Sequence, residues 1–222
     1  MARTRSPDYD NIRAAILDKT AGLFASRGFA ASSIGDIAEA CDCSKSRLYH
    51  YFESKEAILS TMLSEHVEKL LTGAYALLAQ HPDPVERFRA LVRFFLDIYA
   101  FSGDKHAVML TCIEFLPEDT RNEVLGKQRE LVSFVRAILK EIRPERGAES
   151  STTYVDTMLF FGMINWTYTW YRPDGPVKPQ ELADRSLQIF LDGYRSMEPQ
   201  AKKTPGGGRG ARKAAGAPPG KR

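Results

Sequence analysis

Apolar residues recur at spacings of three and four along most of the chain, and no long stretch alternates between apolar and polar residues. The first such stretch ends at Gly28 and places four apolar residues on one helix face: Ile12, Ile16, Leu23 and Phe24. Glycine suits this end because it adopts the left-handed conformation of a helix C-terminus without steric cost. The pattern predicts an all-α fold.

Two short helices are expected next. Ser33 has the character of an N-cap for a helix over residues 34–40, because Asp36 stands three positions later, as in a capping box. Ser44 is the expected N-cap of a second helix, over residues 45–52.

A turn of three residues, 41–43, separates these two helices. Such a turn usually needs one residue near the left-handed region, and Asp42 tolerates that conformation better than most residues other than glycine. On the second helix Leu48 and Phe52 are four apart and face inward. Together the two helices and the turn predict a helix-turn-helix.

Longer helices fill the rest of the chain. Ser54 is the expected N-cap of a helix that reaches Gln80. Further periodic stretches predict helices over residues 85–101, 105–115, 118–142, 151–171 and 179–197.

The composition is that of an ordinary globular protein. Its 222 residues are 43% hydrophobic and 27% charged. No apolar run approaches the roughly 18 residues needed to cross a bilayer, and the basic N-terminus has no apolar segment behind it that would make a signal peptide. We therefore expect a cytoplasmic protein without membrane association.

The three cysteines, Cys41, Cys43 and Cys112, do not form a disulfide framework, which fits a reducing compartment. Cys41 and Cys43 as a metal pair would need further ligands, and His50 alone does not supply them. We expect neither a metal site nor a cofactor.

The basic charge is concentrated at the C-terminus. Residues 201–222 contain seven Lys and Arg and no acidic residue, whereas the rest of the chain is net negative. This segment has no large apolar residue to bury, so it is expected to be disordered. It is either a solubilising appendage or a sequence-independent phosphate binder whose affinity falls steeply with salt.

The second short helix carries residues suited to DNA. Lys45, Ser46 and Arg47 occupy its first turn, which is the part of a recognition helix that reaches base edges in the major groove. Arginine pairs with O6 and N7 of guanine, and Tyr49 or His50 can donate to phosphate. The pattern by itself also fits two adjacent helices of a larger bundle.

Lys55 gives a second indication. A cation in the first turn of a helix opposes the helix dipole, at a cost on the order of a few tenths of a kcal/mol. A phosphate beside Lys55 would reverse that sign, because the ammonium and the backbone N–H groups would share one anion. Lys55 is therefore a predicted phosphate contact.

Residues 24–59, FASRGFAASSIGDIAEACDCSKSRLYHYFESKEAIL, resemble the N-terminal domain of the TetR family of bacterial transcriptional repressors. The resemblance implies that Lys45, Ser46 and Arg47 face bases. It also implies that four residues contact phosphate, namely Ser33, Tyr49, His50 and Lys55. The family usually has glycine where this chain has Asp42, a departure that concerns the turn geometry and not the motif.

The resemblance implies three parts: a DNA-binding domain over residues 1–53, an effector-binding and dimerisation domain over residues 54–198, and a tail over residues 199–222. Family members bind a palindromic operator of double-stranded DNA as homodimers, and the last two helices form the dimer interface. Residues 151–171 fit that role because they are apolar nearly all round. A buried helix of a monomer is the alternative.

The effector site is expected among aromatic and Met residues together with one arginine. These residues are Phe95, Tyr99, Met109, Trp166, Trp170 and Arg172. Residues 164–184 look like the same segment of TetR-type regulators that respond to acyl-CoA thioesters, which implies such an effector. Plain core packing is the alternative for each residue. The protein could also respond to another lipophilic or drug-like effector, or be a DNA architectural protein without a ligand. A P-loop, a dinucleotide fingerprint and a zinc-protease motif are all missing from the sequence, so we do not expect an enzyme.

Overall fold

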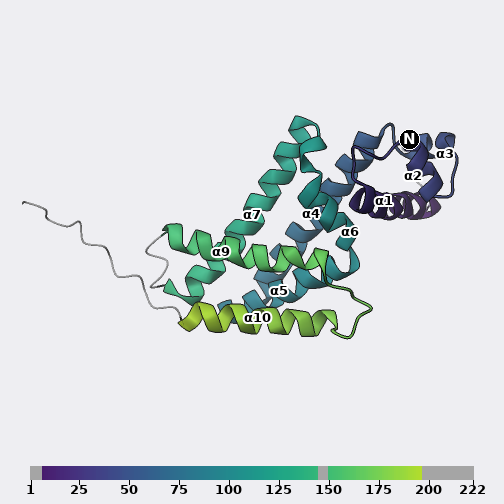
Figure 1. Ribbon diagram of the computed structural model, residues 1–222. Helices are drawn as coiled ribbons and strands as arrows, with labels where there is room; N and C mark the ends of the chain where they lie inside the picture. Colours follow the sequence, from purple (N-terminus) through teal and green to yellow (C-terminus); the bar gives the residue numbers. More distant parts are fainter. Residues whose placement is uncertain (1–6, 145–149, 197–222) are drawn as a thin grey trace, which may run out of the picture.

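The computed structural model describes residues 7–144 and 150–196, which form helices and no β-strand (Figure 1). The N-terminal helices and the long fourth helix are α1 (Pro7–Arg27), α2 (Ile34–Ala40), α3 (Lys45–Tyr51) and α4 (Lys55–Gln80). They are followed by α5 (Pro84–Phe101), α6 (Gly103–Thr111), the 3-10 helix η1 (Ile113–Phe115) and α7 (Glu118–Ile142). The last described elements are α9 (Ser150–Asn165), the 3-10 helix η2 (Trp166–Thr169) and α10 (Pro179–Ser196). The all-α prediction is confirmed.

The three N-terminal helices form a small cluster at one end of the molecule (Figure 1). Ile37 from α2, Leu48 from α3 and Phe52 after α3 are all buried in it. Because each short helix turns its few apolar side chains toward α1 and α4, burial stabilises helices that would not persist alone. The predicted helix-turn-helix is present.

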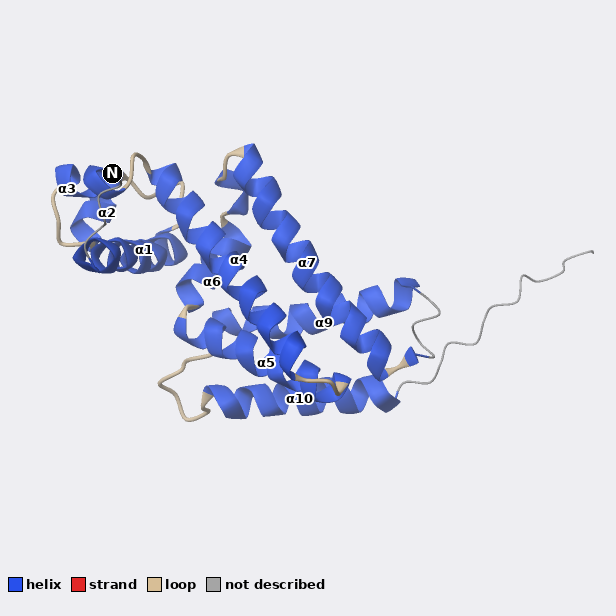
Figure 2. Cartoon of the chain, turned by 180° about the vertical axis from the view of Figure 1, so that it is seen from behind, coloured by secondary structure: helices blue, strands red, loops and turns tan. Residues whose placement is uncertain are grey.

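The larger part of the molecule is a bundle built around α4 and α5 (Figure 2). The most extensive helix pairs are α4 with α7 and α5 with α10. Its core contains Phe88, Phe95 and Phe160, whose rings are almost completely buried. The buried residues of this bundle and of the N-terminal cluster make one continuous core, which runs along α4.

Two predicted helices end earlier than expected. The helix predicted over residues 105–115 begins at Gly103 and ends at Thr111, with a turn of 3-10 helix after it. Cys112 leaves the α-helical conformation, with φ of −124° and ψ of 8°, and this ends α6. Pro117 then favours the extended conformation of Leu116, which ends the 3-10 turn.

The helix predicted over residues 151–171 ends at Asn165 and continues as 3-10 helix. Two threonine hydroxyls bond to carbonyls three residues back, Thr167 to Ile164 and Thr169 to Trp166. Such side-chain bonds compete with the α-helical pattern of the backbone. The last helix runs to Ser196, and the predicted end at residue 197 and the basic tail lie outside the described residues.

The N-terminal cluster is joined to the bundle by α1 and α6 as well as by α4. Helix α1 packs along α6. Lys105 in α6 pairs with Asp18 in α1 at 2.5 Å, and Phe115 stacks on Phe29 with ring centroids 5.0 Å apart. Helices α1 and α6 are therefore held together by packing and by an ion pair.

Candidate DNA-binding surface and effector pocket

The first turn of α3 presents its polar side chains to solvent. Ser44 is the N-cap, and its hydroxyl accepts from the backbone N–H of Arg47 at 3.1 Å. Lys45, Ser46 and Arg47 are exposed, while Leu48 is completely buried. Packing on one side therefore fixes the orientation of α3 and leaves the three candidate base contacts free on the other.

The turn that sets the angle between α2 and α3 has the predicted geometry. Asp42 adopts a left-handed backbone with φ of 53°. Its N–H donates to the carbonyl of Glu39, and the N–H of Cys43 donates to that of Ala38. Asp42 thus occupies the conformation for which glycine is usually preferred.

Ser33 is the N-cap of α2, and the capping box is complete. Its hydroxyl accepts from the Asp36 N–H at 3.2 Å and also donates to the Asp36 carboxylate at 2.6 Å. These hydrogen bonds, with Arg27 alongside, lower the pKa of Asp36. Because the Ser33 hydroxyl hydrogen is already used, a phosphate contact from this hydroxyl would have to replace the bond to Asp36.

Lys55 lies in a different environment from the one inferred from the helix dipole. Its ammonium donates to the carbonyls of Phe29 at 2.9 Å and Ser32 at 2.8 Å, and lies over the Phe29 ring at 4.2 Å. Two carbonyls and an aromatic face compensate the cation without any phosphate. The unfavourable interaction of Lys55 with the helix dipole therefore does not require a bound anion. A phosphate contact would use the third N–H of the Lys55 ammonium.

Tyr49 and His50 point outward from the end of α3. Tyr49 is 53% exposed, and His50 is also exposed. A residue that the sequence reading missed supports this side of the helix: Tyr9 of α1, whose ring lies 4.7 Å from that of Tyr51 and 6.1 Å from that of His50. No sequence signal marks this contact, because α1 and α3 meet only in the folded chain.

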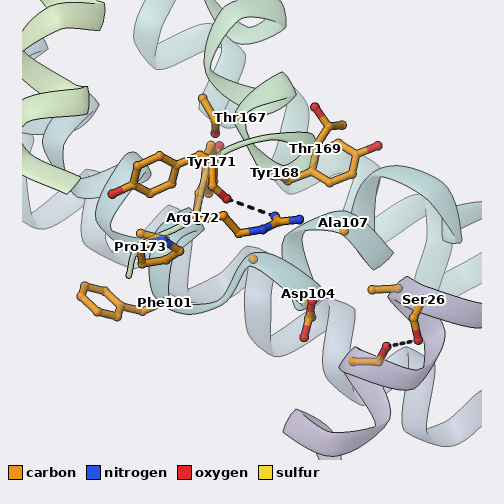
Figure 3. Close-up of a pocket in the computed structure, with 15 residues that line it drawn as sticks. Ser26, Phe101, Asp104, Ala107, Thr167, Tyr168, Thr169, Tyr171, Arg172 and Pro173 are labelled. Carbon is orange, nitrogen blue, oxygen red and sulfur yellow. Dashed lines mark hydrogen bonds between the residues drawn. The ribbon is translucent and has the colours of Figure 1, made fainter. Parts of the chain in front are cut away.

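A pocket of about 480 Å³ lies where α1, α5, α6 and the segment after η2 meet (Figure 3). Gly22 and Ser26 line it from α1, and Asp104 lines it from α6. The opposite wall contains Thr167 and Tyr168. Its walls therefore come from both the N-terminal cluster and the bundle.

Small side chains create much of this space, from Gly22, Ala25, Ala100, Gly103 and Ala107. A Cβ atom added at Gly103 would meet nothing within 4 Å, whereas one at Gly22 would lie 3.3 Å from the Asp104 carboxylate. The pocket is thus open beside Gly103 and narrow beside Gly22. The sequence reading missed these residues, since the small side chains become a wall only when α1 packs on α6.

Of the six predicted effector residues, only Tyr99 and Arg172 line the pocket. Figure 3 shows Arg172 on its wall. Phe95 and Met109 are buried in the core and do not line it. Trp166 and Trp170, placed on one helix face by the sequence reading, are 64% and 56% exposed and do not line it either. The helix ends before them, so the α-helical spacing on which that prediction depended does not hold.

The pocket has charge of both signs at its edges. The Arg172 guanidinium donates to the carbonyl of Tyr171 at 3.3 Å (Figure 3), and it forms no ion pair within residues 7–144 and 150–196. Asp104 lies across from it on α6. Phe101, at the end of α5, is 77% exposed and gives the pocket an apolar edge. Such a site suits a ligand with an apolar part and an anionic part.

Helices α9 and α10 expose large apolar side chains on a second surface. The residues on it are Val155, Met158, Leu159, Trp166 and Ile189. Three positions of this surface follow helical spacing along α9, namely Val155, Leu159 and Gly162, and Trp166 continues the row into η2. Exposed apolar surfaces of this kind are typical of interaction sites.

No metal-binding cluster of three His, Cys, Asp or Glu residues occurs in the described part of the chain. The cysteines are free, with Cys41 and Cys43 half-buried and Cys112 buried. Among the described helices none is long and apolar enough to cross a membrane.

Two protein-family models match the chain. Residues 16–62 match the model for bacterial regulatory proteins of the tetR family, and residues 81–194 match the model for the C-terminal domain of tetracyclin repressor-like proteins. The first match spans the helix-turn-helix, and the second covers about half of the chain. Family members are regulators and not enzymes.

Individual relatives agree with these matches. A TetR-family transcriptional regulator from Bordetella parapertussis 12822 has 54% identity to the chain and a TM-score of 0.80, over 85% of this chain and 98% of the other. The transcriptional repressor KstR2 of Rhodococcus jostii is 29% identical over 83% of this chain and 91% of its own. AibR in complex with isovaleryl coenzyme A and operator DNA shares the fold, with 24% identity, a TM-score of 0.66 and coverage of 80% and 97%. The chain therefore belongs to the TetR family of bacterial transcriptional regulators.

Proposed function

We propose that the protein is a ligand-responsive transcriptional repressor that binds a palindromic operator as a homodimer and is released by a small lipophilic effector, an acyl-CoA thioester. The observation that carries the proposal is the pocket between α1 and α6, which a ligand can occupy only while touching the DNA-binding end. The relative KstR2 is named a repressor, and the AibR structure contains an acyl-CoA together with operator DNA.

The proposed DNA contacts fall into two groups: side chains that are exposed, and side chains whose hydrogen-bond donors are mostly used within the protein. Lys45, Ser46 and Arg47 read bases, because they are exposed on a helix whose other side is buried. Tyr49 and His50 contact phosphate from the end of the same helix. Ser33 and Lys55 contribute less, since their donors are mostly used within the protein, and their effect on DNA is chiefly to hold α2 and α4 in place.

Dimerisation uses the apolar surface of α9 and α10. A single helix-turn-helix contacts few base pairs, so specific binding needs two copies on a palindrome. Trp166 belongs to this surface, where it extends the row of Val155 and Leu159. Large aromatic side chains of this kind dominate the free energy of protein interfaces.

The effector fits the pocket by its chemistry. The exposed Phe101 and the small side chains of α1, α5 and α6 accept the apolar part. The guanidinium of Arg172, which forms no ion pair with the described residues, attracts the phosphates of coenzyme A, which arginine binds well. The pocket volume is within the range of about 300–1,000 Å³ that is usual for small-molecule sites.

Release from DNA follows from where the pocket lies. Operator binding requires the two recognition helices to meet major grooves about 34–36 Å apart. A ligand between α1 and α6 displaces α1, and α1 carries α2 and α3 with it, so the spacing no longer matches. The ligand must prefer this displaced state, because equal affinity for both states would shift nothing.

The test is operator binding with and without candidate effectors. The protein is added to labelled DNA fragments taken from beside its own gene, and binding is followed by fluorescence anisotropy. The titration is made without ligand and with acyl-CoA thioesters of different chain length. A thioester of the right class lowers operator affinity by about 1–3 kcal/mol, which is typical of allosteric coupling. Gly103→Phe should fill the pocket, since a Cβ there meets nothing, and the variant should bind the operator but no longer respond.

Gly126→Phe on α7 is the matched control, because Gly126 does not line the pocket. It should respond as the unmodified protein does. Operator binding that no thioester alters would reject the acyl-CoA and favour a different lipophilic or drug-like effector. Binding that depends on DNA length but not on sequence would reject the repressor and favour an architectural protein. We further propose the division into residues 1–53, 54–198 and 199–222.

A further inference from the structure

A second, smaller cavity lies inside the N-terminal cluster, between α1 and the turn that joins α2 to α3. Its volume is about 200 Å³, and two cysteines of the turn, Cys41 and Cys43, line it. Both cysteines are free and half-buried. The proposed function uses neither of them, although the same cavity is also lined by Arg47 of α3, one of the proposed base contacts.

The backbone of the turn holds the two cysteines in fixed positions. The N–H of Cys41 donates to the carbonyl of Ile37 at 2.9 Å. The N–H of Cys43 donates to the carbonyl of Ala38 at 3.0 Å, and Asp42 between the cysteines is left-handed, with φ of 53°. Burial raises the pKa of the Cys41 thiol, and the Cys43 thiol beside it raises this pKa further. The two cysteines therefore form a pair of thiols on the wall of one cavity.

Two cations border the same cavity. Lys19 lines it from α1 and Arg47 lines it from α3, and both side chains are exposed. Neither of them forms an ion pair within residues 7–144 and 150–196. The wall also contains the carboxylate of Asp42 and an apolar part from Ile12 and Ile16 of α1. With both thiols protonated, the cavity wall therefore carries an excess of positive charge.

The number and charge of these groups select the kind of metal ion that two thiols can bind. Zinc takes four ligands in structural sites, and no group of three His, Cys, Asp or Glu residues lies together in the described part of the chain. Copper(I) is a soft cation that prefers thiolates, and two thiolates in a linear arrangement complete its coordination. Its complex with two thiolates is an anion, which the excess positive charge of Lys19 and Arg47 compensates. The corresponding complex of mercury(II) is neutral and leaves this charge uncompensated.

We propose that Cys41 and Cys43 bind one copper(I) ion through their two sulfur atoms, and that the bound ion withdraws Arg47 from DNA. Each thiol releases its proton to solvent when its sulfur binds copper, because the thiolate is the ligand. The anionic complex then attracts the guanidinium of Arg47, which lines the same cavity. A guanidinium held at the turn no longer reaches a base edge, so copper(I) lowers operator affinity. The metal site is independent of the proposed effector, whereas its influence on DNA rests on the proposed base contact.

Copper(I) binding is measured on the full chain in oxygen-free buffer, by competition with the chelator bathocuproine disulfonate. The unmodified protein should take up one copper(I) ion per protomer. Cys41→Ser and Cys43→Ser should each abolish this uptake, because one thiolate does not complete the coordination. Cys112→Ala is the matched control, since Cys112 is buried and does not line the cavity, and it should bind copper(I) as the unmodified protein does. Circular dichroism without copper shows whether each variant is folded, and alanine replaces serine in a variant that is not.

The second measurement is DNA binding by fluorescence anisotropy, on a fragment that the copper-free protein binds. Copper(I) should lower the affinity about tenfold, the loss expected when one bidentate contact between arginine and guanine is removed. Arg47→Ala should bind the fragment more weakly from the start, and copper(I) should then cause no further loss. Mercury(II) should bind the same two thiols but have a smaller effect on DNA, because its complex is neutral and does not attract the guanidinium.

Copper(I) that is retained by the variants of both Cys41 and Cys43 would overturn the proposed metal site. So would a disulfide between these two cysteines that persists in oxygen-free buffer, seen as a mass lower by two hydrogens. Copper(I) bound by the pair without any change in DNA affinity would overturn the role given to Arg47. If the copper-free protein binds no fragment, the repressor is rejected, and the chelator competition alone then decides on the metal site.

Discussion

The helix-turn-helix and the segment that follows α9 differ in how closely the structure agrees with the local sequence signals. In the helix-turn-helix, Ser33 and Ser44 are the N-caps and Asp42 is left-handed, as their positions predict. After α9, the apolar pattern continues through Trp170, yet the α-helix ends at Asn165. The same kind of sequence reading therefore succeeded in one place and placed two tryptophans wrongly in the other.

The difference lies in the range of the interactions. The caps of α2 and α3 are hydrogen bonds between residues three apart, so the sequence contains both partners side by side. After α9 the chain is held by the Thr167 and Thr169 hydroxyls and by Tyr171, whose hydroxyl donates to the carbonyl of Val177 at 3.0 Å. Threonine can make or omit such a bond, and packing against α5 and α6 decides which.

The largest expected effect concerns long-range packing, in the pair His66 and His106. Burial lowers their pKa values from 6.5 to about 4 and about 3. As the pH falls, these histidines are protonated in the unfolded chain before they are protonated in the folded protein. The free energy of unfolding is therefore highest above pH 6.5 and falls as the pH drops toward 3. We expect the free energy of unfolding to lose on the order of 3 kcal/mol or more between pH 7 and pH 4.

Urea denaturation at both pH values measures this loss. His66→Leu/His106→Phe is the control, because it keeps the carboxylates that also titrate in this range and removes only the two imidazoles. An equal loss in the variant would mean that carboxylates alone cause the acid sensitivity.

Trp166→Ala tests whether the misplaced tryptophan belongs to the dimer surface. We expect the dimer to weaken by about 2–4 kcal/mol, because a large aromatic residue is lost from the apolar surface of α9 and α10. Sedimentation equilibrium measures the dissociation constant. Trp170→Ala removes an equally large exposed side chain that lies outside the helical row of Val155 and Leu159, and it should leave the constant nearly unchanged. Equal losses would place the interface elsewhere.

Ser33→Ala tests the local signals directly. Loss of this cap should lower the free energy of unfolding by about 1 kcal/mol. Chemical denaturation followed by circular dichroism measures the change. Ser46→Ala is the matched control, since Ser46 is exposed and caps no helix, and its stability should not change measurably. A capping box without energetic value would give the same result for both variants.

Asp42→Gly has the smallest expected effect. Glycine relieves the left-handed strain but gains freedom in the unfolded chain, so the protein should become more stable by only about 0.5 kcal/mol. Asp42→Ala removes the same carboxylate and keeps the strain, so it should be less stable than the glycine variant. Thermal melts of both variants give the comparison, and the opposite order would mean that the aspartate side chain itself stabilises the turn.

The sequence by itself determined the helical class, the helix-turn-helix and the exposed first turn of α3. Apolar spacing encodes the helices, and partners three residues apart encode the caps, so both could be predicted without a neighbour. Helix starts were accurate where a predicted cap stood in the sequence, as at Ser33, Ser44 and Ser54.

Only the tertiary structure decided the pocket, the buried histidine pair and the surroundings of Lys55. Gly22 and Gly103 are 81 positions apart in the chain and share a wall only because α1 packs on α6. His66 and His106 are 40 positions apart, and Lys55 reaches carbonyls 26 and 23 positions away. Such contacts depend on how whole helices pack, and packing is a property of all the buried side chains together, which no local stretch of sequence contains.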